Sequence, residues 1–176
     1  MDLQAILITR HSKESTDELV HWVGESQKRF DRLFAFFTGP DARLAQVSAW
    51  PLSYCVIEHP SLIKKHWKET LENFEKPLIH DAIKRNTLRL LQSVEIPVKY
   101  HGRVMTKCFD LICSPAEKPA IKAFSLTVLA NLATLYPEIR EELITVIETQ
   151  WPFEKAAFRS RARKILKLYN AGIPAE

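Results

Sequence analysis

The sequence predicts an all-α fold built from consecutive helix pairs, and three observations support this prediction. Apolar and small residues recur with a period of 37 to 39 residues. Within each copy these residues follow the 3.6-residue spacing of a helix. Prolines lie between the expected helices, and with only four glycines in 176 residues the chain has no hairpin signals that would favour strands.

Four leucines anchor the repeat at spacings of 39, 38 and 37 residues: Leu52, Leu91, Leu129 and Leu166. The residue eight positions before each anchor is apolar: Leu44, Ile83, Ile121 and Phe158. The residue four positions before it is small: Ser48, Thr87, Ser125 and Ala162. These positions share one face of a helix, and we expect the small residues to let a neighbouring helix approach closely.

A second apolar set repeats between these helices in its own phase. Its members are Phe30, Trp67, Met105 and Leu143, each followed four residues later by Phe34, Leu71, Phe109 and Ile147. Each repeat is therefore a helix pair. We expect first helices near 26–38, 61–75, 98–113 and 138–150, and partner helices near 41–58, 79–94, 117–135 and 153–170. An N-terminal helix starting at Ser15 or Thr16 and ending at Val23 caps the stack.

Pro51 is the exception, because it lies inside a predicted partner helix. An interior proline removes one backbone hydrogen bond and costs about 3 kcal/mol. The sequence therefore predicts either a kink at this point or two short helices.

Four helix pairs of this length, with openings such as Asp81-Ala82-Ile83-Lys84, resemble HEAT and armadillo repeats, and look closest to short HEAT-like proteins of bacteria. The resemblance implies a right-handed α-α superhelix. We expect a single HEAT-like domain over residues 1–176, with a cap at 1–24, repeats at 25–58, 60–95, 97–135 and 137–170, and a tail at 171–176. Arg43 and Arg163 depart from the pattern in the terminal copies, where solvent-facing replacements are expected.

The composition excludes disordered and membrane proteins, since 46% of the residues are hydrophobic and 26% are charged. The start, Met1-Asp2-Leu3-Gln4, has no basic region before its apolar run, so no secretory signal is expected. Cys55, Cys108 and Cys113 form no paired framework and lie among apolar residues. We interpret all three as reduced core residues of a cytoplasmic protein.

No catalytic motif is found, so we expect a non-enzymatic protein with no cofactor and no metal. Six histidines form no zinc-binding pattern: His11, His21, His59, His66, His80 and His101. Asp81 is better explained as a helix N-cap than as an acid or base. Cys108 and Cys113 lack a basic environment that would stabilise a thiolate.

The candidate binding surface is the face formed by the second helices, where cations recur in register. The chain carries a net charge of +4, all of it in residues 89–176. The candidate binding residues are one tryptophan, expected to be exposed, and seven cations: Trp50, Lys84, Arg85, Arg89, Lys122, Arg159, Arg163 and Lys164. Alternatively, these cations are only the solvated edges of amphipathic helices.

Two functions remain open at this stage. The first is a protein-interaction or scaffold module that binds a protein or an acidic peptide along the second helices. The second is a nucleic-acid-associated protein resembling the helical-repeat DNA glycosylases in architecture, although none of their pocket residues can be aligned here. The sequence favours the first, because a net charge of +4 is weak for nucleic-acid binding. It indicates no oligomeric state.

Overall fold

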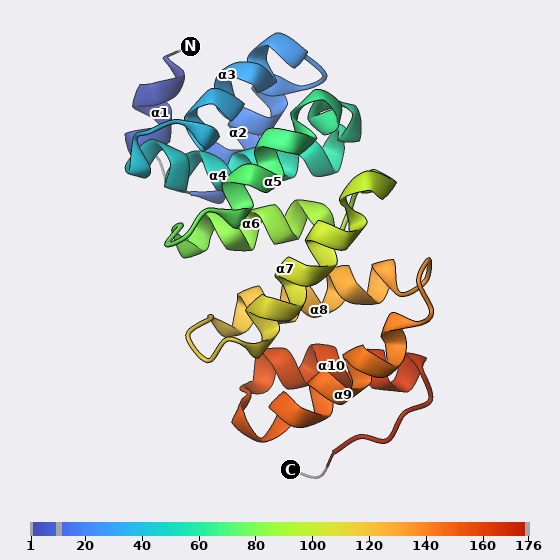
Figure 1. The fold of residues 1–176 in the computed structure, drawn as a ribbon. Coiled ribbons are helices and arrows are strands. Elements are labelled where there is room, and N and C mark those ends of the chain that lie inside the picture. Colours follow the sequence, from blue (N-terminus) through green and yellow to red (C-terminus); the bar gives the residue numbers. More distant parts are fainter. Residues whose placement is uncertain (1, 10–11, 175–176) are drawn as a thin grey trace. The chain divides into compact units, whose positions relative to one another are not determined.

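The computed structural model describes residues 2–9 and 12–174, which form ten α-helices and three short 3-10 helices without any strand (Figure 1). The predicted all-α fold is therefore confirmed. The chain divides into two compact units, Met1–Val94 and Glu95–Glu176. This division falls between the second and third predicted repeats. The single-domain interpretation and the superhelical handedness stay predictions.

The first unit is organised around one central helix, α4. In chain order its elements are α1 (Leu3–Thr9), α2 (Lys13–Val23), α3 (Gln27–Thr38), α4 (Ala42–Glu58), the 3-10 helix η1 (Pro60–His66), α5 (Trp67–Glu75) and α6 (Asp81–Leu91). Helix α4 packs against α1, α2, α3, η1 and α6. It is apolar on most of its circumference, which is the pattern of a helix buried on several sides.

The second unit has the same plan around α8. Its elements are η2 (Val98–Tyr100), α7 (His101–Cys113), α8 (Pro119–Leu132), α9 (Ile139–Gln150), η3 (Trp151–Phe153) and α10 (Ala156–Leu168). Helix α8 packs against α7, α9 and α10. It is also apolar almost all round. The predicted helix pairs are thus present in both units, with ends close to the expected positions.

The repeat positions of the second helices form the core. All four anchor leucines are buried, and so are the apolar residues eight positions before them. The four small residues between them are each 0% exposed: Ser48, Thr87, Ser125 and Ala162. Neighbouring helices therefore pack directly over the small side chains, as the spacing predicts.

Pro51 does not divide its helix. Helix α4 runs without interruption from Ala42 to Glu58, so the alternative of two short helices is wrong. The proline nitrogen cannot donate to the carbonyl of Val47. Burial of Leu52, Cys55 and Val56 on the following turns outweighs this loss, since each is 0% exposed. The kink stays a prediction.

Three helix starts differ from the sequence-based positions. Helix α1 was not expected; it buries Leu3 and Leu7 and packs against α4. Helix α2 begins after Ser12, whose hydroxyl accepts a hydrogen bond from the Ser15 amide, so Ser15 is not the start. The N-cap of α6 is His80 rather than Asp81. The starts of α2 and α6 differ from the prediction because neighbouring polar residues compete for the cap.

Parts of the predicted cap and tail lie outside the described residues: Met1, Arg10, His11, Ala175 and Glu176. None of the helices in the described ranges is both long and apolar enough to cross a membrane.

Candidate functional site

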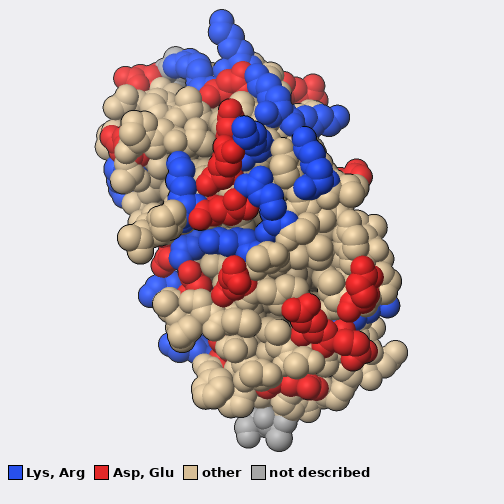
Figure 2. Space-filling view, viewed as in Figure 1, with Lys and Arg blue, Asp and Glu red and all other residues tan. Residues whose placement is uncertain are grey.

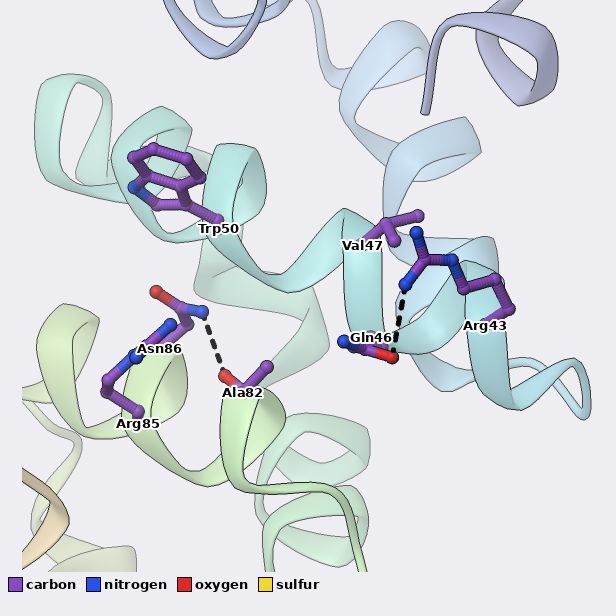
Figure 3. Close-up of a pocket in the computed structure, with 7 residues that line it drawn as sticks. All are labelled: Arg43, Gln46, Val47, Trp50, Ala82, Arg85 and Asn86. Atoms are coloured by element: carbon purple, nitrogen blue, oxygen red, sulfur yellow. Dashed lines mark hydrogen bonds between the residues drawn. The ribbon is translucent and has the colours of Figure 1, made fainter. Parts of the chain in front are cut away.

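A pocket of about 280 Å³ opens on the second helices of the first unit, between α4 and α6. The described residues that line it are drawn in Figure 3: Arg43, Gln46, Val47, Trp50, Ala82, Arg85 and Asn86. They include two arginines and no carboxylate. The pocket is therefore positively charged and suits an anion.

Helical periodicity explains why these side chains meet. The four residues from α4 lie at offsets of 0, 3, 4 and 7, which is one face of the helix. The three residues from α6 lie at offsets of 0, 3 and 4. Because α4 and α6 pack directly on each other, the two faces form the opposite walls of the pocket (Figure 3).

Trp50 brings an unsatisfied hydrogen-bond donor to this pocket. The side chain is half-buried, not exposed as predicted, and its indole Nε1 is shielded from solvent. That nitrogen has no hydrogen-bond partner among the described residues. A buried donor left unpaired costs about 1–3 kcal/mol.

Asn86 forms the fixed part of the pocket wall, because both ends of its amide are occupied. Its Nδ2 donates to the carbonyl of Ala82 at 2.8 Å, and its Oδ1 accepts from Arg89 Nη1 at 2.5 Å. Asn86 is 1% exposed. The side chain is therefore held in one orientation and is not the group that meets a ligand.

The cations predicted on α6 have three different surroundings. Arg85 lines the pocket, is exposed, and has no hydrogen-bond or ion-pair partner in the described part of the chain. Arg89 lies 5.4 Å above the ring of Tyr54 and does not line the pocket. Burial lowers the pKa of Arg89; Tyr54 opposes this effect and Arg85 adds to it. Lys84 lies 3.4 Å from Asp81 on the same helix. Of these three cations of α6, only Arg85 lines the pocket.

Arg43, which sequence reasoning noted only as a departure from the repeat, supplies the second pocket charge. It is exposed, and its Nη1 lies 3.5 Å from Gln46 Oε1 (Figure 3). Arg43 could have been identified from the sequence by its spacing from Gln46 and Trp50, which places the three residues on one face of α4.

Lys122 does not belong to an exposed basic surface. It forms an ion pair with Glu154, which lies between η3 and α10. Only 4% of the Lys122 side chain and 7% of the Glu154 side chain are exposed. The expectation that Lys122 faces solvent beside the other cations is therefore wrong. The repeat spacing correctly predicts the position of Lys122 on its helix. It cannot show that Glu154, from the segment between η3 and α10, lies beside this lysine.

The arginines of α10 pack on an aromatic ring. Arg159 and Arg163 lie 5.6 Å and 5.2 Å from the ring centre of the buried Trp151. Arg159 Nε also donates to the carbonyl of Trp151 at 3.2 Å. Lys164, on the same helix, is exposed. Of these predicted site residues, Lys164 alone presents its charge fully to solvent.

The buried histidines have structural partners. His66 stacks on Phe34 at 4.0 Å, and its Nε2 lies 2.8 Å from Asp31 Oδ1. His101 bridges the Tyr136 hydroxyl, at 2.8 Å, and the Ile96 carbonyl, at 2.6 Å. Among the described residues, no group of three or more histidine, cysteine or acidic side chains is arranged to hold a metal.

The cysteines differ from one another. Cys55 and Cys108 are buried as predicted, and burial raises the pKa of each thiol to about 12. Cys113, the last residue of α7, is exposed, so its interpretation as a core residue is wrong. Helical periodicity predicts burial less well at the last residue of a helix, which is where Cys113 lies.

No curated protein and no solved structure matches this chain significantly. A family model described as a HEAT repeat domain matches residues 3–169, which includes every helix of both units. The repeat period, the paired helices and the buried anchor leucines agree with this match. The chain therefore belongs to the HEAT repeat family.

Proposed function

We propose that this protein is a non-enzymatic interaction module that binds an acidic segment of a partner protein in the pocket between α4 and α6. Membership of the HEAT repeat family suggests a general role in protein interaction or scaffolding. The pocket lies on the second helices, where repeat proteins of this kind offer binding surfaces.

The observation that carries the proposal is the pair of arginines, Arg43 and Arg85, in a pocket whose described lining holds no acid. A carboxylate has only acceptor atoms, so its two oxygens can accept guanidinium N–H groups from Arg43 and Arg85. At about 280 Å³ the pocket lies just below the usual size of small-molecule sites. It therefore suits a Glu or Asp side chain better than a cofactor.

Several features disfavour the nucleic-acid alternative. Lys122 is buried in an ion pair, and Arg159 and Arg163 pack on Trp151. Trp50 is half-buried, whereas bases stack on exposed aromatic rings. The continuous row of exposed cations expected from the sequence is thus interrupted.

The test is an NMR titration of the ¹⁵N-labelled protein with an eight-residue peptide of alternating Glu and Ala. The four tryptophans give four indole N–H signals, and the Trp50→Phe spectrum identifies the Trp50 signal by its absence. We expect the Trp50 signal to shift most, and no shift with the matching Gln and Ala peptide. Arg85→Gln is expected to weaken binding about tenfold, because it removes a charge-assisted hydrogen bond.

Lys164→Gln is the matched control, since it removes one exposed cation from the second unit. Equal loss of affinity in Lys164→Gln and Arg85→Gln would show that only net charge matters and would overturn the pocket proposal. Micromolar, salt-steep binding of a mixed-sequence DNA duplex, without a shift of the Trp50 signal, would favour the nucleic-acid function instead.

A further inference from the structure

We propose that the second unit has a separate docking groove, between α7 and α9, for a basic amphipathic helix of a partner protein. The groove has a volume of about 410 Å³. The described residues that line it combine an apolar floor with two acids: Gly102, Met105, Thr106, Phe109, Asp110, Ile139 and Glu142. Both helices are first helices of their pairs, so this groove is independent of the α4–α6 pocket.

The floor of the groove uses residues that the other repeats bury. Met105 and Phe109 are half-buried. Their counterparts in the other three copies are at most 5% exposed: Phe30, Phe34, Trp67, Leu71, Leu143 and Ile147. The third repeat thus departs from an internal pattern that the rest of the same chain follows. Met105 and Phe109 therefore add partly exposed apolar surface to the groove, and contiguous surface of this kind is typical of an interaction site.

Gly102 keeps the groove open. The corresponding positions of the other copies, three residues before the first apolar residue of each pair, carry long side chains: Gln27, Lys64 and Arg140. A Cβ added at Gly102 would meet no atom within 4 Å, so close packing inside the chain does not require glycine here. Gly102 is the second residue of α7, so its cost relative to alanine is smaller than the ~0.5–1 kcal/mol of a glycine in the middle of a helix. Its presence is explained if a partner occupies the space.

The charge of the groove indicates the charge of the partner. Asp110 and Glu142 line the groove, and its described lining includes no cation. Glu141, next to Glu142 on α9, is also exposed. Figure 2 shows acidic side chains gathered among residues without charge on the surface of the second unit in this view. An apolar floor with an acidic border is complementary to an apolar side chain flanked by Lys or Arg.

A helix is the form of partner that fits. The lining residues of α7 lie at offsets of 0, 3, 4, 7 and 8, and those of α9 at 0 and 3. Two helices with such ridges form a groove that accepts the apolar stripe of a third helix. A membrane surface is disfavoured, because its anionic lipids would repel the carboxylates.

The probe for this proposal is a fourteen-residue amidated peptide of Leu and Lys, with the leucines on one helical face. Its affinity is measured by fluorescence anisotropy at two salt concentrations. The controls are a scrambled peptide of the same composition and a peptide with Glu in place of Lys. We expect binding of the first peptide to be at least tenfold tighter than binding of either control, and weaker at high salt.

Gly102→Gln is the decisive variant, because it fills the groove without removing any contact. We expect it to lose at least tenfold in affinity while its midpoint of urea unfolding stays equal or rises. Asp110→Asn with Glu142→Gln should remove most of the salt dependence. Trp50→Phe, in the other unit, should leave this peptide's affinity unchanged.

Equal binding by wild type and Gly102→Gln, or equal binding of the scrambled peptide, would overturn the proposal. Concentration-dependent dimerisation abolished by Gly102→Gln would overturn it too, since the occupant would then be a second copy of the chain. The two proposals are tested with peptides of opposite charge and with different variants. Failure of the groove proposal can therefore be told apart from failure of the acidic-segment proposal.

Discussion

The two units carry cations at matching positions of the repeat but place them in different surroundings. Lys84 in the first unit and Lys122 in the second both lie seven residues before an anchor leucine. The Lys84 side chain is 15% exposed and pairs with Asp81 of its own helix, whereas Lys122 is 4% exposed and pairs with Glu154. A position in the repeat therefore determines the helix face, while the neighbouring segments determine whether the charge is neutralised.

The largest expected effect comes from breaking the buried pair of the second unit. We expect Lys122→Met to lower the free energy of unfolding by about 3–5 kcal/mol, because Glu154 is left buried without its partner. Lys84→Met, the matched change in the first unit, should cost no more than about 1 kcal/mol. Urea denaturation followed by circular dichroism measures both.

A double variant, Lys122→Met with Glu154→Met, separates the lost pair from lost packing. We expect it to recover most of the stability, since neither charge then remains buried alone. Similar losses in Lys84→Met and Lys122→Met would contradict the difference between the two units.

A smaller effect is expected at the arginines that pack on Trp151. Replacing Arg159 and Arg163 together by lysine should cost about 1–2 kcal/mol, because lysine keeps the charge but loses the planar contact with the ring. Arg161→Lys, on the same helix, should stay within about 0.5 kcal/mol. Thermal and urea unfolding of the variants test this, and equal stability of all of them would show that the ring contacts contribute nothing.

The smallest effect concerns Asp31, which lies near the surface of the first unit. Burial raises its pKa, but hydrogen bonds from Lys65, Gln27 and His66 outweigh this and hold the pKa at about 2, below the usual 3.8. Because the folded-state pKa is lowered, the stabilisation is present above pH 4 and is lost as the pH falls from about 4 to about 2. The side chain is 36% exposed, so solvent screening limits the effect to about 1 kcal/mol.

Asp31→Asn tests this assignment. We expect the variant to lose less stability than the wild type between pH 5 and pH 2.5, measured by urea unfolding at each pH. Parallel pH profiles for the two proteins would show that another carboxylate is responsible.

The sequence alone predicted most of the fold, because the repeat reports burial directly. Leu91 and Leu129 lie in the core, as their spacing predicts, because each stands on the apolar face of its helix. Helix starts were less certain. Ser12 and Ser15, like His80 and Asp81, compete for one cap, and only the backbone geometry selects between them.

The candidate sites were predicted less completely. Arg85 and Trp50 were identified from composition and register, and the structure places both in one pocket. Arg43, Met105 and Phe109 were seen only as repeat positions. Whether such a residue is covered depends on side chains from other helices, which a one-dimensional period does not describe.

The sequence by itself determined the helix pairs and the identity of the core. The periodic apolar residues form one face of each helix, and they leave water only when that face is buried. The tertiary structure decided which charged and polar side chains have a partner inside the protein. Glu154 neutralises Lys122, the Trp50 N–H has no hydrogen-bond partner in the described part of the chain, and Met105 and Phe109 stay half-buried beside Gly102 in one groove. These outcomes depend on distances between segments far apart in the chain, and electrostatic and hydrogen-bond energies change steeply over such distances.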